Sequence, residues 1–234
     1  MEHFLFKYLQ EKKHIVSLVG AGGKTTVMYQ LAAHFANLGK KVLLTTTTHI
    51  FQPASNFAQS LSEVEAFWKA GNYAVVGNIE AGTGKLTQLP TDVFETYSAL
   101  ADLVLIEADG AKRLPCKAPA ENEPVLLPTS DTVIAVMGLD ALHHPIKEVC
   151  FRLEKVQEVL PVTPEHCLTE EDAVKLLLSE KGAFKNVGQR NYFIVLNKCD
   201  DENRLNSALE IKSLLEKEGF DLEKLWIRGE AYRE

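Results

Sequence analysis

The sequence is poor in cysteine, and its four cysteines lie far apart in the chain. None of them forms the C-x-x-C spacing that is typical of zinc sites and redox motifs. Thiols so few and so widely spaced do not make a disulfide framework either. We therefore expect reduced thiols without a special role at Cys116, Cys150, Cys167 and Cys199, with Cys116 a partial exception because of its position in the chain.

The chain also lacks an apolar run of membrane-spanning length. Its N-terminal segment, MEHFLFKYLQEKKH, has neither the apolar core nor the cleavage site of a signal peptide, and its mixed pattern is typical of a short amphipathic helix. Positive charge is in deficit, with 25 Lys and Arg against 32 Asp and Glu. A surface that binds nucleic acid needs clustered positive charge. We expect a cytoplasmic protein that binds neither nucleic acid nor membranes.

Repeats and low-complexity linkers are absent, and apolar runs alternate with segments of helical period. We expect strands at 14–20, 40–48, 73–80, 102–110, 131–138 and 191–200, with a turn at 81–85 that leads back along 85–90. Helices are expected at 1–14, 24–38, 60–71, 91–101, 147–160, 168–182 and 201–219. Apolar strands alternating with helices indicate a mostly parallel sheet covered by helices on both faces. The predicted fold is therefore α/β and P-loop NTPase-like, with residues 1–234 forming a single nucleotide-binding domain.

Residues 17–32, SLVGAGGKTTVMYQLA, have the form of a phosphate-binding loop that is two residues short. A strand ends at Val19, glycines follow, and Lys-Thr-Thr opens a helix. Glycines let backbone N–H groups converge on a phosphate, and the helix N-terminus adds its dipole. A glycine-rich turn before an ordinary helix does not explain Lys-Thr-Thr at this junction. We predict that a nucleotide is bound by Gly20, Ala21, Gly22, Gly23, Lys24, Thr25 and Thr26.

Each residue of the Lys-Thr-Thr sequence has a predicted role. Lys24 is expected to face solvent, to neutralise the β- and γ-phosphates and to act in catalysis. The Thr25 hydroxyl is expected to ligate Mg²⁺, and Thr26 to lie near the α-phosphate.

The run LIEADG, residues 105–110, provides acids at the end of a buried strand. Nucleotide hydrolases keep an acid for Mg²⁺ and a glycine amide for the γ-phosphate at such a place. Glu107 and Gly110 fit these two roles, and Asp109 competes with Glu107 for the first. The alternative is a strand followed by a polar turn. We predict catalytic roles for Glu107 and Asp109, with Glu107 as a metal ligand and Gly110 in nucleotide binding.

Two further strand ends carry polar residues. In TTTTHI, residues 45–50, the side chains of Thr47, Thr48 and His49 follow the strand, where Thr47 is a candidate metal ligand; β propensity alone is the alternative. The segment IVLNKCD, residues 194–200, has the Asn-Lys-x-Asp spacing of guanine recognition. There, Asn197, Lys198 and Asp200 are predicted to bind the base, and the alternative is a strand that simply ends in polar residues.

The proline-rich stretch 114–128 is the one long irregular segment, and such loops tend to be functional. Lys112, Arg113 and Lys117 lie at its start. We predict that these three cations meet an anionic substrate or a partner.

Four segments in this order, VGAGGKTT, TTTTHI, EADGAKRLPCKAPAENEPVL and NKCD, resemble the YqeC family of selenium-dependent hydroxylase accessory proteins. The resemblance covers nearly the whole chain, and residues 107–128 are its most specific part. It implies a role in making or inserting a labile selenium cofactor, with a molybdenum hydroxylase or a selenium-donor protein as partner. More distantly, Glu-x-x-Gly and Asn-Lys-x-Asp look like the metallochaperone GTPases that insert nickel or cobalamin. The short loop also resembles the ATP-binding loop of Mur ligases.

These observations predict a protein that binds Mg²⁺ with GTP or ATP and hydrolyses the nucleotide to drive cofactor maturation. One alternative is a phosphotransferase or ligase that passes the phosphoryl group to a small molecule. Another is a non-catalytic scaffold that uses nucleotide only to order a partner-binding face.

Overall fold

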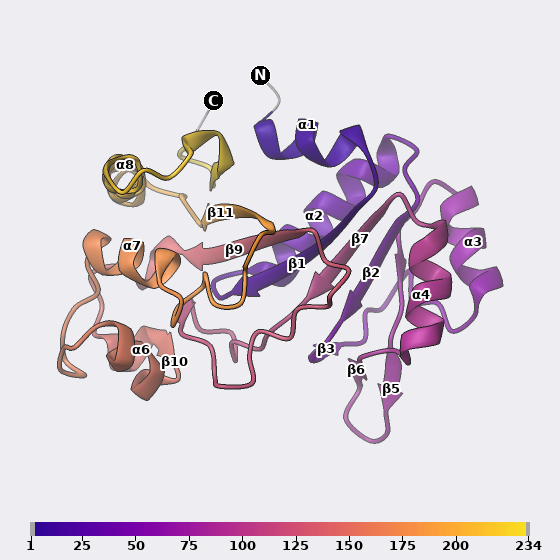
Figure 1. The fold of residues 1–234 in the computed structure, drawn as a ribbon, viewed down its shortest axis with the longest axis horizontal. Helices are drawn as coiled ribbons and strands as arrows, with labels where there is room; N and C mark the ends of the chain where they lie inside the picture. The colour runs from indigo at the N-terminus through magenta and orange to yellow at the C-terminus, as the bar shows by residue number, and fades with distance from the viewer. Residues whose placement is uncertain (1–2, 233–234) are drawn as a thin grey trace.

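The computed structural model describes residues 3–232 and is built on a seven-stranded sheet (Figure 1). All six strand pairings in this sheet are parallel, and the strand order is β12-β11-β9-β1-β7-β2-β4. The bounds are β1 His14–Gly20, β2 Val42–Thr46, β4 Ala74–Val75, β7 Leu103–Glu107, β9 Thr132–Gly138, β11 Asn191–Asn197 and β12 Leu225–Arg228. The expected α/β fold is confirmed.

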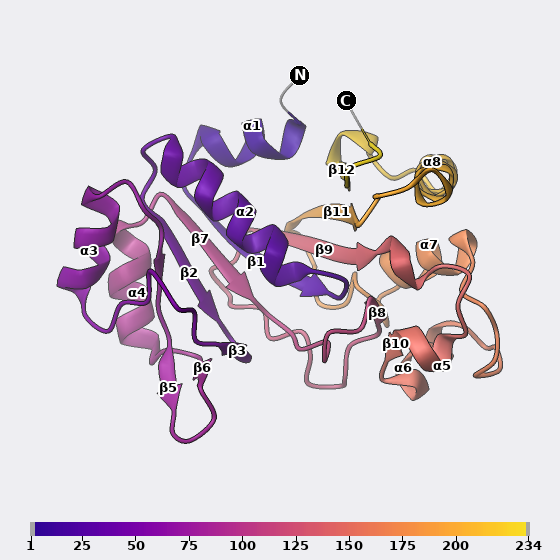
Figure 2. The ribbon, with the colours of Figure 1, turned by 180° about the vertical axis from the view of Figure 1, so that it is seen from behind.

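Helices cover both faces of the sheet because alternate strand residues point to opposite sides. On one face, Val16 and Leu18 of β1 belong to a core with α1 (Phe4–Glu11) and α2 (Lys24–Asn37), and Figure 2 shows α2 lying across the sheet. The opposite face is covered in two parts. Over β2 and β7 lie α3 (Leu61–Lys69) and α4 (Thr91–Leu100). Over β9 and β11 lie α6 (Leu153–Val159), α7 (Glu170–Leu178) and α8 (Glu202–Lys217).

The strand expected at 73–80 is divided between two sheets. Its first part is β4 at the edge of the main sheet, and its second part, β5 (Asn78–Glu80), pairs with β6 (Lys85–Thr87). β3 (His49–Phe51) completes this small antiparallel sheet. The break falls at Gly77, where a Cβ would lie 2.8 Å from the Leu86 Cβ, so the chain can turn here only without a side chain. The small sheet projects beyond the ends of β2 and β7 (Figure 1).

The helix expected at 147–160 is also interrupted. It consists of α5 (Ile146–Val149), the two-residue strand β10 (Cys150–Phe151) and α6. Arg152 has a φ of +63°, which reverses the chain direction between β10 and α6. β10 pairs with β8 (Cys116–Lys117), so the segment expected to be irregular contains a short strand. This pairing holds the 108–128 loop against the region around Phe151.

The short elements η1 (Leu139–Ala141), η2 (Leu222–Lys224) and β12 were not expected from the sequence. Because the sheet is parallel, the carboxyl ends of β1, β2, β7, β9 and β11 lie at one edge. Ligands of open α/β sheets bind at that edge. Among the helices formed by residues 3–232, none combines the length and the apolar character needed to cross a membrane.

Candidate functional site

The loop after β1 can be built only with glycine at two of its positions. A Cβ on Gly20 would lie 2.4 Å from the carbonyl oxygen of Val136, and one on Gly22 would lie 2.0 Å from the amide nitrogen of Gly138. Both residues also have positive φ values, of +91° and +76°. The glycines therefore let the loop lie directly against the end of β9.

Some amides of this loop bond to the protein and others are left for a ligand. The Ala21 amide donates to Val136 O over 2.8 Å, and the Gly22 amide donates to Leu114 O over 3.2 Å. Within the described residues, the amides of 23–26 have no such partner. They are the orphan donors of a helix N-terminus. An anion here would therefore meet the amides of 23–26, whereas those of Ala21 and Gly22 are engaged elsewhere.

Lys24 does not face solvent, contrary to expectation. Its side chain is only 4% exposed, and its Nζ donates to the carbonyl oxygen of Gly20 over 2.7 Å. The same Nζ lies 3.0 Å from Asp109 Oδ1. The chain turns the lysine back on its own loop because a buried ammonium group needs acceptors on several sides.

The two acids of LIEADG have different surroundings. Glu107 Oε2 accepts a hydrogen bond from the Thr25 hydroxyl at 2.8 Å, so the two predicted magnesium ligands meet. Burial raises the pKa of Glu107, against the opposing effect of Lys24 and Thr25. Asp109 instead accepts from the Gly20 amide at 2.9 Å and faces Lys24. This geometry favours Glu107 for the metal and gives Asp109 the role of bracing the loop.

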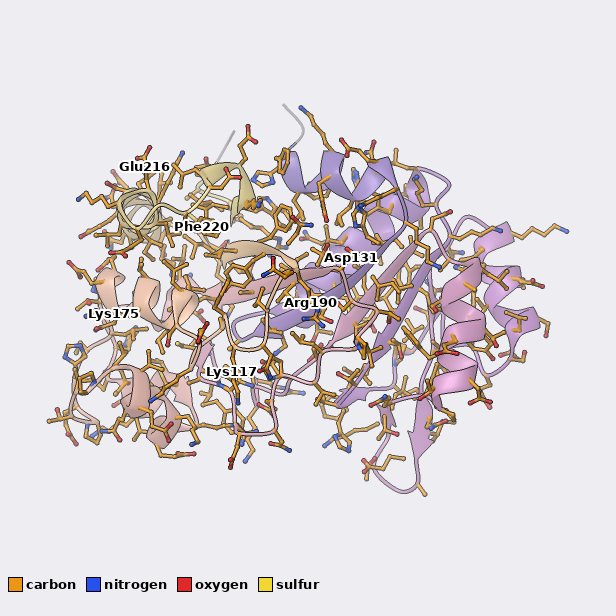
Figure 3. The ribbon with its side chains drawn as sticks, in the orientation of Figure 1. Lys117, Asp131, Lys175, Arg190, Glu216 and Phe220 are labelled. Carbon is orange, nitrogen blue, oxygen red and sulfur yellow. The ribbon has the colours of Figure 1, made fainter. Side chains whose placement is uncertain are left out.

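A chain of buried charges continues from Asp109. Lys117 Nζ lies 3.1 Å from Asp109 Oδ2 and 2.7 Å from Glu123 Oε2, and Glu123 Oε1 accepts from Arg152 at 2.6 Å. The Lys117 side chain is 1% exposed; Figure 3 labels it among the loops. Lys117 is therefore not placed to meet a substrate from solvent. Hydrogen bonds and charge from Lys117 and Arg152 lower the pKa of Glu123, although burial alone would raise it.

The threonines at the end of β2 bond to the backbone of neighbouring segments. Thr46 Oγ1 donates to the carbonyl oxygen of Glu107 over 2.9 Å, and Thr47 Oγ1 donates to the carbonyl oxygen of Val125 over 2.8 Å. His49 lines the cleft described below, but Thr47 is not among its lining residues. Thr47 as a metal ligand stays a prediction that this geometry does not favour.

The Asn-Lys-x-Asp residues are spread over three environments. Asn197 is buried, and its Nδ2 donates to the carbonyl oxygen of Gly22 over 2.7 Å. Lys198 pairs with Asp140 over 2.5 Å and lines the cleft. The Asp200 carboxylate accepts from the Glu230 amide at 3.4 Å and does not line the cleft. Only Lys198 is thus in direct reach of a ligand, while Asn197 supports the loop.

These elements surround a cleft of about 1140 Å³. Its walls come from residues 22–26, from the small sheet, from 110–114, and from Phe151 and Arg152. Two acids line it, Glu80 and Glu107, against six cations: Lys24, Lys85, Lys112, Arg113, Arg152 and Lys198. A concave surface with this excess of positive charge attracts anions even though the chain as a whole has a net charge of −7.

Several cleft residues had no sequence signal. Arg152 and Phe151 lie in a segment with helical period, and Tyr29 looks like an ordinary residue of α2. Burial, followed by the charges of Tyr73 and Glu107, raises the pKa of Tyr29 to about 12. Its hydroxyl thus stays protonated and can donate to a ligand. Within residues 3–232, no group of three or more His, Cys, Asp or Glu side chains is arranged to hold a metal ion.

Comparison with known proteins agrees with the resemblance seen in the sequence. The profile of the YqeC protein family matches residues 16–154. The chain is also 33% identical to "Uncharacterized protein YqeC" of Escherichia coli (strain K12), over 93% of this chain and 88% of the relative. Both matches include the loop around Lys24 and the strand end at Glu107. The chain therefore belongs to the YqeC family.

Proposed function

We propose that this protein binds a Mg²⁺–nucleoside triphosphate, GTP or ATP, in the cleft and hydrolyses it. The observation that carries the proposal is the 2.8 Å contact between the Thr25 hydroxyl and the Glu107 carboxylate. It lies at the start of α2, beside Lys24 and the free amides of 23–26. A hydroxyl, a carboxylate, a lysine and a helix N-terminus form the donor set that phosphate and Mg²⁺ require together.

Thr25 and Glu107 are suited to bind a magnesium ion that is also bound by the phosphates of a nucleotide. Mg²⁺ is commonly bound by one or two protein oxygens, with phosphate oxygens and waters completing its shell. Thr25 and Glu107 supply two such oxygens, and this set does not need a cluster of three acids. When bound, the ion neutralises charge that develops on the transferred phosphoryl group.

Lys24 must change partners when a nucleotide binds. Its Nζ leaves Gly20 O and Asp109 for the β- and γ-phosphate oxygens, and Lys117 remains beside Asp109 to balance the carboxylate. Water then attacks the γ-phosphorus and the bond to the β–γ bridging oxygen breaks, which yields phosphate and the nucleoside diphosphate. Lys24 and the amides of 23–26 stabilise the charge of the transition state.

The reaction would serve maturation of a selenium-containing molybdenum hydroxylase in the cytoplasm, with that enzyme or a selenium-donor protein as partner. This part of the proposal rests on the family resemblance. Phosphoryl transfer to a small molecule is a second candidate, favoured by the cationic cleft wall of Lys112, Arg113 and Arg152.

The test is binding and hydrolysis by the wild type, the K24A variant and the matched control K175A. Lys175 lies on α7 (labelled in Figure 3), its side chain is 62% exposed, and it is not among the residues that line the cleft. We expect K24A to lose triphosphate binding while K175A keeps it, with Mg²⁺-dependent phosphate release in wild type and K175A only. Circular dichroism of K24A checks that the variant is folded. A folded K24A variant with wild-type affinity would refute the proposal.

A further inference from the structure

One wall of the cleft is formed by cations that lie over aromatic rings. Lys112 Nζ is 5.3 Å and Arg152 Cζ is 4.7 Å from the centre of the Phe151 ring. Arg113 Cζ lies 5.7 Å from the centre of the Phe51 ring, which belongs to the small sheet. We call Lys112, Arg113 and Arg152 the anion wall. Contact with a ring fixes a cation in place without neutralising its charge.

The anion wall is short of negative partners. Within residues 3–232, neither Lys112 nor Arg113 makes an ion pair or a hydrogen bond through its side chain. Arg152 donates to Glu123 through Nη2, but its Nε is buried without a hydrogen-bond partner. A buried guanidinium donor without an acceptor is costly, and an oxyanion would satisfy it.

The backbone also holds the anion wall in an unfavourable conformation. Seven non-glycine residues of the described chain have positive φ, and four of them line the cleft: Lys112, Arg113, Arg152 and Lys198. All four are cations. Left-handed backbone is unfavourable for residues other than glycine and persists where the surrounding structure maintains it, often at ligand sites.

The cleft is larger than one ligand requires. Its volume of about 1140 Å³ exceeds the range of roughly 300–1,000 Å³ that is usual for small-molecule sites. In the proposed function, a nucleotide held by Lys24, Thr25 and Glu107 would occupy the end of the cleft at α2. The anion wall follows Gly110, the residue predicted to contact the γ-phosphate, so a second ligand there would lie beside that phosphate.

We propose that the anion wall binds a second small molecule that carries an oxyanion, either a carboxylate or a phosphate monoester. The guanidinium groups of Arg113 and Arg152 fit the two oxygens of such a group, and Lys112 adds charge. The position beside the γ-phosphate rests on the proposed function, whereas the binding of the anion does not.

The experiment measures anion binding by calorimetry, with inorganic phosphate and succinate as separate probes. The first arm uses full-length protein saturated with Mg²⁺ and a non-hydrolysable triphosphate, so that the loop at Lys24 is filled. The second arm uses the K24A variant without nucleotide, and it stays informative if no nucleotide binds. Each arm compares the parent with its K112Q/R113Q derivative, and K175Q is the control. Both substituted side chains are exposed, so these variants should fold.

We expect at least one probe to bind in both arms, with affinity reduced about tenfold or more by K112Q/R113Q and unchanged by K175Q. The tighter of the two probes identifies the group as phosphate or carboxylate. Absence of binding by both probes, or binding that K112Q/R113Q does not weaken, would overturn the proposal. If a probe binds to the anion wall in the second arm but the wild-type protein binds no nucleotide, the proposed function is rejected and the proposal for the anion wall stands.

Discussion

The side-chain amide of Asn197 holds the carbonyl oxygen of Gly22 at 2.7 Å, and the two residues lie 175 positions apart in the sequence. On its other side, the Asn197 oxygen accepts from Arg228. Asn197 therefore connects the phosphate loop to the two strands at the edge of the sheet, β11 and β12. Base recognition by Asn197 stays a prediction, whereas its contact with the glycine-rich loop is observed.

Replacing Asn197 by alanine should weaken nucleotide binding without removing any direct ligand contact. The Gly22 carbonyl and the Arg228 guanidinium would both lose a partner in a buried place. We expect the free energy of unfolding to fall by about 1–3 kcal/mol, with nucleotide affinity reduced about tenfold. Asn191, exposed at the other end of β11, provides the matched control. Equal effects of N197A and N191A in denaturant unfolding and nucleotide titration would contradict this role.

Replacing Glu107 and replacing Asp109 should have different effects, the first on hydrolysis and the second on stability. E107Q should suppress Mg²⁺-dependent phosphate release more than nucleotide binding and leave the fold stable, because burial already disfavours the charge of Glu107. D109N should instead lower stability, by about 3–5 kcal/mol, because Lys24 and Lys117 lose their shared buried counter-charge. Denaturant unfolding and phosphate-release assays on both variants measure the two effects. If D109N is as stable as the wild type and hydrolyses more slowly than E107Q, the two roles are reversed.

Guanine recognition by Asp200 predicts tighter binding of GTP than of ATP. A carboxylate that accepts from two donors of guanine discriminates by about 1–3 kcal/mol. D200N should weaken the binding of GTP. It should strengthen the binding of xanthosine triphosphate, because the carbonyl group of xanthine can accept a hydrogen bond from the new amide. In the structure this carboxylate accepts from the Glu230 amide through Oδ1, and its Oδ2 lies 3.7 Å from Arg204 Nη1, so a base would compete with both. Equal affinities for ATP and GTP that D200N does not change would exclude guanine recognition.

Asp131 should make folding stability depend on pH below neutrality. Burial alone would raise the pKa of Asp131, but hydrogen bonds from His14, Thr132 and the Ile15 amide lower it overall. A lowered pKa in the folded state stabilises the protein above the pKa of the unfolded chain, and this contribution is lost as the pH falls through the folded value.

We therefore expect D131N to lower the free energy of unfolding by about 1 kcal/mol at pH 7, since the carboxylate is 40% exposed and partly screened. The difference from wild type should shrink below about pH 4. Asp131 directly precedes the amino end of β9 and does not line the cleft, so nucleotide binding should be unaffected. Urea unfolding at several pH values tests this, and a difference that stays constant down to pH 3 would contradict it.

The main sheet and the glycine-rich turn from β1 into α2 could be predicted because their signals are local. Apolar runs such as HIVSLVG and DLVLIE predict buried strands, and glycines before Lys-Thr-Thr predict a turn into a helix. β12 escaped prediction because LWIR is only four residues long and gains its place by pairing with β11. The break at Arg152 depends on the pairing of Cys150 with Cys116, a contact between distant segments that periodicity does not contain.

The placement of side chains in the site could be predicted only where a single element determines it. Thr25 and Glu107 follow from a helix start and a strand end, and the structure brings them together. The burial of Lys117 depends on Asp109 and Glu123, which lie eight and six residues away in the same irregular loop, and on Arg152 from a distant segment, which pairs with Glu123. The orientation of Lys24 likewise depends on Asp109, two residues after the end of β7, rather than on its own helix.

The inward position of Lys24 has a consequence for selectivity in the cell. Any anion that enters the loop competes with the Gly20 carbonyl and the Asp109 carboxylate for one ammonium group. Free orthophosphate, with a single phosphorus centre and no metal bridge, offers too few contacts to win that exchange. A triphosphate that brings Mg²⁺ to Thr25 and Glu107 offers more. We therefore expect orthophosphate to leave Lys24 bound to Gly20 and Asp109, and only the nucleotide to displace these two partners.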